Sequence, residues 1–310
     1  MSIFLRQEPE HNCFDYRYAA SDPGVKFSDD RLRIIGSKQW NTALARGCAY
    51  HGQWYYECTI AEPSPNWMQF SLYGWDDTCS TISSLLKALP SLKDSIFPSV
   101  RVGWGTRLMK LDSPLGYSPF SYCISQINGD LIYAKKTHPG GENAHTLQVG
   151  DVIGCAINLC QPIFNLEDPR GNPDLWPFTK CGLLCNVTKE CTLPPLIINK
   201  NSFASFSVNG KWLNNTIKPI YCAEYHPAVS TYMGSSVTIN LGPKFKYNPP
   251  NRKYKAACYM CESKYPCKED LVKYWVFADT NLMHPKVKDK LKKLNIEGVV
   301  TLAQAELGFD

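Results

Sequence analysis

The stretch Trp54-Tyr55-Tyr56-Glu57-Cys58-Thr59-Ile60 is rich in aromatic and β-branched residues, which favour extended backbone. Short runs of this kind recur from residue 31 to residue 247 and are separated by Gly, Pro, Asn and Ser. The other candidate strands are Leu32–Ile35, Val100–Trp104, Phe120–Ile124, Val152–Asn158, Ser205–Val208 and Val237–Leu241. These seven candidates predict an all-β fold, an antiparallel sandwich or a barrel.

Two dipeptides predict tight turns between strands. Asn128-Gly129 and Asn209-Gly210 both have strand-like residues on either side. Asn and Gly tolerate the positive φ angles that a two-residue hairpin turn requires. We therefore expect a β-hairpin at each position.

Three segments depart from the strand pattern. Residues 63–99 and 161–201 are long stretches that we interpret as loop insertions, which surface connections tolerate at little thermodynamic cost. After Pro249-Pro250 the chain becomes rich in lysine with apolar residues at helical spacing. The predicted organisation is a β-sandwich domain over residues 1–250 and a Lys-rich helical C-terminal extension over residues 251–310.

Composition indicates a folded protein rather than a disordered chain, with 44% apolar and 20% charged residues. No run of 18 apolar residues occurs and the first residues do not form a signal peptide, so we expect a chain inside the cell with no membrane segment. The fourteen cysteines are then expected to be reduced thiols. A net charge of +5 is too small to imply nucleic-acid binding by itself.

Six ordered motifs carry a resemblance to a known family. They are Phe27–Leu32, Gly52–Glu57, Arg101–Trp104, Ser113–Tyr117 followed by Phe120–Tyr122, Val149–Gly154 and Thr238–Tyr247. The first three motifs are similar to those of SPRY domains in general, and the other three are similar to one subfamily of them. Together they resemble the SPRY domain of the Ash-two-like subunit of COMPASS/MLL-type histone methyltransferase complexes, over roughly residues 21–250. The resemblance implies a SPRY-type antiparallel β-sandwich with the two insertions unmatched.

The resemblance also implies a function and a site. Ash-two-like subunits are nuclear and non-catalytic. With a WD-repeat partner they stimulate methylation of lysine four of histone three by a SET-domain enzyme.

The family holds an acidic segment of the WD-repeat subunit in a basic, aromatic-rimmed pocket, and the matching positions here are Trp40, Arg101, Pro114 and Tyr117. Arginine suits this task because its guanidinium binds a carboxylate or phosphate with paired hydrogen bonds. One position departs, because Ser125 stands where the family has a second arginine.

The extension carries a second candidate site. In the family, a helix after the SPRY domain docks into a small helical dimer called Dpy-thirty. Here Val299, Leu302 and Leu307 could form a similar apolar face, although the motif itself does not align. The lysines between 286 and 293 could instead contact nucleosomal DNA. A helix that packs back on the sandwich, or a solvated charged face, is the plainer alternative.

The sequence gives little support for an enzyme. Phosphate-loop, dinucleotide-loop, zinc-protease and serine-hydrolase motifs are missing, so we predict no catalytic residues and no cofactor. Cys48 with His51 is a weak candidate for a nucleophile and its base. Asp29-Asp30 is more simply a turn than a pair of catalytic carboxylates. The leading alternative is another SPRY adaptor, such as a ubiquitin-ligase substrate receptor, and an enzyme on a sandwich scaffold ranks third.

Metal binding has one weak candidate. Cys258, Cys261 and Cys267 supply three sulfurs where a tetrahedral zinc site needs four ligands, and His284 could complete the set. Cys181, Cys185 and Cys191 also stop at three. We predict no metal and leave zinc at Cys258, Cys261 and Cys267 open.

Overall fold

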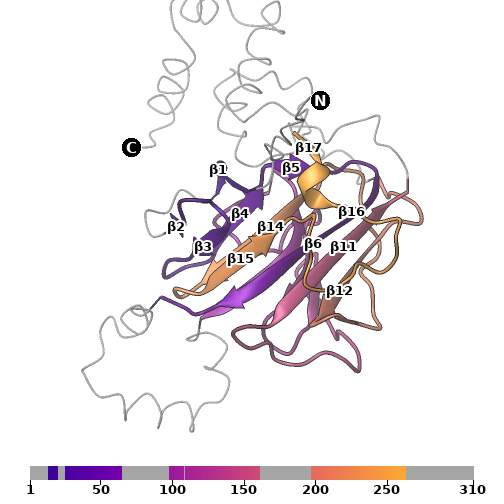
Figure 1. Ribbon diagram of the computed structural model, residues 1–310. Coiled ribbons are helices and arrows are strands. Elements are labelled where there is room, and N and C mark those ends of the chain that lie inside the picture. Colours follow the sequence, from indigo (N-terminus) through magenta and orange to yellow (C-terminus); the bar gives the residue numbers. More distant parts are fainter. Residues whose placement is uncertain (1–12, 20–24, 65–97, 108, 161–196, 263–310) are drawn as a thin grey trace, which may run out of the picture. The chain divides into compact units, whose positions relative to one another are not determined.

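Two antiparallel sheets pack face to face in the computed structural model, which describes residues 13–19, 25–64, 98–107, 109–160 and 197–262 (Figure 1). The first sheet has the strand order β1 (Phe14–Ala19), β4 (Asn41–Ala45), β14 (His226–Tyr232), β7 (Ser99–Gly105), β8 (Tyr122–Ser125), β9 (Leu131–Tyr133) and β10 (Lys136–His138). The second has the order β13 (Lys211–Trp212), β12 (Phe203–Val208), β11 (Val152–Leu159), β6 (Gly52–Ala61), β15 (Ser236–Asn240), β3 (Arg33–Ile35) and β2 (Lys26–Phe27). The predicted all-β antiparallel sandwich is confirmed.

The two predicted turns are also confirmed. Asn128 and Gly129 have φ angles of 57° and 64° between β8 and β9, and Asn209 and Gly210 have 49° and 80° between β12 and β13. Positive φ at both central residues gives the turn a twist that matches the flanking strands. Each hairpin is therefore fixed by its own local sequence.

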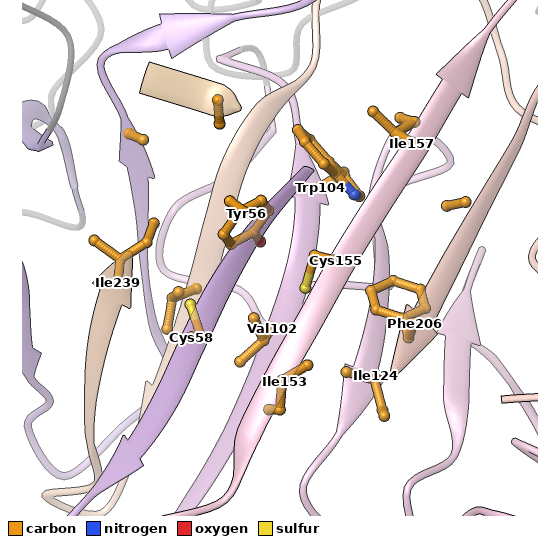
Figure 2. Close-up of a cluster of buried hydrophobic side chains, with 14 of the residues drawn as sticks. Tyr56, Cys58, Val102, Trp104, Ile124, Ile153, Cys155, Ile157, Phe206 and Ile239 are labelled. Atoms are coloured by element: carbon orange, nitrogen blue, oxygen red, sulfur yellow. The ribbon is translucent and has the colours of Figure 1, made fainter. Parts of the chain in front are cut away.

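Alternate residues of the central strands form the core between the sheets. Figure 2 shows Tyr56 and Cys58 from β6, Val102 and Trp104 from β7, and Cys155 from β11 in this core. The Tyr56 and Trp104 rings meet edge to face, with centroids 5.0 Å apart. Burial raises the pKa of the Cys58 and Cys155 thiols well above the usual range, so both stay protonated at neutral pH. These thiols pack the core and are not poised to react.

The sandwich continues beyond the predicted boundary at residue 250. Strand β16 (Lys255–Ala256) pairs in parallel with β6, and β17 (Cys261–Glu262) pairs with β5 (Gly47–Cys48). Five residues of this segment are buried: Tyr254, Ala256, Ala257, Cys258 and Met260. Residues 251–262 therefore contribute to the sandwich, and the helical extension stays a prediction for the residues that follow.

Several expectations fall outside the described residues. They concern most of the two insertions, at 65–97 and 161–196, and the chain from residue 263 on. Val299, Leu302, Leu307 and the lysines of that segment belong to this group, so the second partner site and the DNA contact stay predictions. Among the described residues, no helix is long and apolar enough to cross a bilayer.

Candidate functional site

A row of polar side chains crosses the outer face of the first sheet. Thr42 of β4 lies opposite Ser230 of β14, Ser230 lies opposite Arg101 of β7, and Arg101 lies opposite Ser125 of β8. Directly paired residues point to the same face of a sheet. Val100 and Val102, on either side of Arg101, enter the core, so Arg101 and its paired neighbours face outward. We call Thr42, Ser230, Arg101 and Ser125 the polar row.

The polar row holds the loop that follows β7. The Thr42 hydroxyl donates to the Ser113 carbonyl at 2.7 Å, the Leu115 backbone N–H donates to the Ser230 hydroxyl at 2.8 Å, and Arg101 Nη1 donates to the Leu115 carbonyl at 2.8 Å. A small apolar cluster packs beneath the loop: Leu44, Met109, Leu115, Cys123, Ile132 and Ala228. Burial in it raises the pKa of Cys123 to about 12. The loop is thus anchored at both its backbone and its side chains.

Arg101 lies between two aromatic rings. Its guanidinium carbon is 4.8 Å from the centroid of the Trp40 ring and 5.4 Å from that of Tyr117. Trp40 in turn stacks on Tyr232, with centroids 5.1 Å apart and an interplanar angle of 20°. Such contacts fix a cation in place and partly desolvate it without neutralising its charge.

The charge of Arg101 is left without a counter-ion. Arg101 forms no ion pair with any residue that the structure describes, and its Nε is buried without a hydrogen-bond partner there. A buried charged donor with no acceptor costs free energy unless a ligand supplies one. The Tyr117 ring beside it is 46% exposed. The guanidinium is therefore suited to accept an anion from solvent or from a partner.

The structure places all four predicted site residues together. Trp40, Arg101 and Tyr117 form the stack described above, and Pro114 lies in the same loop, where its carbonyl accepts the Tyr117 backbone N–H at 3.3 Å. Pro114 is buried, so its contribution here is to shape the loop rather than to offer an exposed surface. Tyr232 was not predicted, because its contact with Trp40 joins segments far apart in the sequence and no motif marks it.

Ser125 occupies a buried position beside Arg101. Its side chain is 5% exposed, and its hydroxyl accepts the Ile127 backbone N–H at 3.3 Å. Because it is the direct cross-strand neighbour of Arg101, a longer side chain at this position would reach the same patch of surface. The described site has one guanidinium where the resemblance predicts two.

In the structure, the residues of the two candidate catalytic pairs make packing and turn contacts. Cys48 is buried and donates from its thiol to the Glu224 carboxylate at 3.8 Å, whereas the exposed His51 ring packs against Tyr50. Asp30 accepts hydrogen bonds from the Ser28 hydroxyl and the Leu32 backbone N–H at 2.5 and 2.9 Å. These bonds lower the pKa of Asp30, with the Ser28 contact the larger cause. Asp29-Asp30 is therefore the turn between β2 and β3, as expected.

The structure describes two of the three cysteines of the open zinc prediction. Cys258 is buried, and Cys261 is exposed on β17 opposite Cys48. Cys267 and His284 lie outside the described residues, as do Cys181, Cys185 and Cys191. Within the described ranges, no three His, Cys, Asp or Glu side chains are grouped so that they could hold a metal ion.

Together these features define a class of protein: an antiparallel β-sandwich whose sheet face and ordered loop present a cationic, aromatic surface site. The chain is similar in sequence to the Set1/Ash2 histone methyltransferase complex subunit ASH2 of Drosophila melanogaster, with 27% identity over 83% of this chain and 40% of that protein. It is 29% identical to the corresponding subunit ash-2 of Caenorhabditis elegans, over 60% of this chain and 34% of that protein. These matches confirm the resemblance to Ash-two-like subunits that the sequence motifs indicate.

Two further comparisons add little to this relationship. No family model matches the chain. The SPRY domain of human HERC1 aligns with 73% of this chain and 96% of its own length, at 13% identity and a TM-score of 0.39, which is too low to support an argument. The match covers 40% of the length of the fly protein and 34% of the worm protein.

Proposed function

We propose that this chain is a non-catalytic subunit of a nuclear, Set1/COMPASS-type histone methyltransferase complex, and that it binds an acidic segment of a WD-repeat partner at Arg101. The observation that carries the proposal is the Arg101 guanidinium, held between Trp40 and Tyr117 without a counter-ion among the described residues. The relatives support membership of such a complex, since both are named as subunits of Set1/Ash2 histone methyltransferase complexes.

The chemistry of the site favours an extended acidic peptide. A carboxylate can accept hydrogen bonds from the guanidinium, and the partly buried setting strengthens such a charge-assisted bond. The exposed Tyr117 offers a flat apolar surface on which the peptide backbone packs at low entropic cost, while Trp40, stacked on Tyr232, holds Arg101 in position. The methyl transfer itself belongs to the SET-domain partner, and this chain contributes by holding the WD-repeat subunit in the complex.

Calorimetry with a matched pair of peptides tests the site. An extended peptide with several Asp and Glu residues is titrated into the whole chain, followed by the same peptide with every acid replaced by its amide. We expect the amide peptide to bind at least about tenfold more weakly, because the amides cannot form a charge-assisted bond with Arg101. Equal affinity of the two peptides would contradict an acidic ligand.

Ser125 sets the preference between a carboxylate and a phosphate. One guanidinium matches a single negative charge, whereas a phosphoserine carries close to two. We expect Ser125→Arg to tighten binding of a phosphorylated acidic peptide by roughly three- to tenfold, with a much smaller gain for the unmodified peptide. The measurement is the ratio of the two dissociation constants in the wild type and in the variant.

Ser125→Ala is the matched control for this substitution. It removes the hydroxyl that bonds Ile127 and adds no charge, so the ratio of the two dissociation constants should stay at the wild-type value. A second arginine opposite Arg101 also places like charges side by side, which is expected to lower stability by up to about 1 kcal/mol. An unchanged ratio in a folded Ser125→Arg protein would place this residue outside the binding surface.

A further inference from the structure

A cationic strap, residues 243–255, covers the outer face of the second sheet. Between Leu241 and Cys261 the sequence has five cationic residues and no acidic residue. All five are exposed: Lys244, Lys246, Arg252, Lys253 and Lys255. The strap belongs to the sandwich and packs on the second sheet, whereas Arg101 lies on the first sheet.

Aromatic residues of the strap face the sheet and its cations face solvent. The Phe245 ring meets the Tyr55 ring of β6 edge to face, with centroids 4.7 Å apart. Tyr254 is buried in a cluster with Tyr55 and Ala156. Tyr247 packs against the Gly210 turn, where an added Cβ would come within 2.6 Å of its ring. The exposed cations alternate with these anchors.

The backbone of the strap is held firmly. The buried Glu57 carboxylate of β6 accepts the backbone N–H groups of Lys246 and Tyr247 at 2.8 and 2.7 Å. The Asn251 side chain accepts the backbone N–H of Lys253 at 2.8 Å, and Lys255 pairs with Trp54 through β16. A charge array on a fixed backbone loses less conformational entropy on binding than a flexible tail.

The cations of the strap have no acidic partners in the described structure. None of the five forms an ion pair with a residue that the structure describes. Lys246 lies over the Tyr247 ring at 5.7 Å, and Lys255 lies over the Trp54 ring at 5.9 Å. These contacts restrain the side chains without cancelling their charge.

We propose that the strap binds the phosphate backbone of nucleic acid without reading its sequence. Exposed cations that form no ion pairs release condensed counter-ions when they neutralise phosphates, and this release supplies most of the affinity of non-specific binding. The strap spreads its charge along an exposed segment, as a repeating polyanion requires, whereas the Arg101 site concentrates one guanidinium between two rings. The proposal is independent of the peptide-binding function, since it concerns different residues on the other sheet.

The test compares two double charge reversals in the whole chain. Lys246→Glu with Lys253→Glu alters the strap. Lys135→Glu with Lys136→Glu changes the net charge by the same amount at the β9–β10 turn of the first sheet, where both lysines are exposed. Binding to a fluorescent duplex of random sequence is measured by anisotropy at several salt concentrations. Single-stranded DNA and anionic phospholipid vesicles are the other two probes.

We expect the strap variant to bind the duplex roughly ten- to thirtyfold more weakly than the wild type, and its salt slope to fall by close to two. The control variant should lose less than about threefold. Equal losses in the two variants, or a preference for vesicles over both nucleic acids, would overturn the proposal. Acidic-peptide binding should survive in the strap variant, so failure here is distinguishable from failure of the Arg101 site. Melting curves show whether each variant is folded.

Discussion

Replacing Arg101 with alanine is expected to weaken binding of an acidic peptide by about 1.5–3 kcal/mol, or roughly 10- to 150-fold. The substitution removes the one guanidinium that Trp40 and Tyr117 hold in place. A charge-assisted hydrogen bond in a partly desolvated setting contributes a free energy of this size. Isothermal calorimetry on the wild type and the variant gives the difference directly.

Arg101→Lys separates charge from geometry in the same experiment. Lysine keeps the positive charge but lacks the planar fork that stacks between two rings, so its affinity should lie between those of the wild type and the alanine variant. Melting temperatures are compared in parallel, because Arg101 also bonds the Leu115 carbonyl. An alanine variant that is folded and binds with the wild-type dissociation constant would remove Arg101 from the site.

Glu57→Ala is expected to lower the free energy of unfolding by about 3–5 kcal/mol. The Glu57 side chain is 1% exposed and accepts four hydrogen bonds, two of them from the strap backbone. The others come from the Asn240 amide at 3.3 Å and the Tyr55 hydroxyl at 3.2 Å. Alanine would leave these donors buried without their acceptor, and each such donor costs free energy.

Urea denaturation with an exposed control variant measures this effect. Glu62→Ala, one residue beyond the end of β6, removes a carboxylate of the same size from the surface and should change stability by less than about 0.5 kcal/mol. Similar unfolding midpoints for the Glu57→Ala and wild-type proteins would show that the strap does not depend on this carboxylate.

Most of the fold was predictable because local composition marks the strands. All seven predicted strands occur, within a few residues of their expected bounds. Strand β4, Asn41–Ala45, was missed because Asn-Thr-Ala-Leu-Ala has few β-branched and no aromatic residues. Strand β14 was missed because it contains Pro227, which normally argues against a central strand. Pairing with β4 starts only at Ala228, so Pro227 lies beyond that ladder.

The site was predictable only in part. The motifs identify Arg101, Pro114 and Tyr117, but the contacts of Arg101 depend on strand register and loop anchoring, which no local pattern specifies. Ser230 and Tyr232 come from β14, the strand that composition concealed. The strap was not predicted as a site, because the sequence places Arg252, Lys253 and Lys255 in the C-terminal extension. Only the pairing of β16 with β6 shows that this part of the strap belongs to the sandwich.

Affinity purification of the tagged whole chain from its native cells, followed by mass spectrometry, tests the central claim most directly. The wild type should recover a WD-repeat subunit and a SET-domain methyltransferase in reproducible amounts. The Arg101→Ala chain should lose most of the WD-repeat subunit while staying folded and equally abundant. Recovery of ubiquitin-ligase subunits in place of these proteins, or equal recovery of the WD-repeat subunit by both chains, would contradict the account.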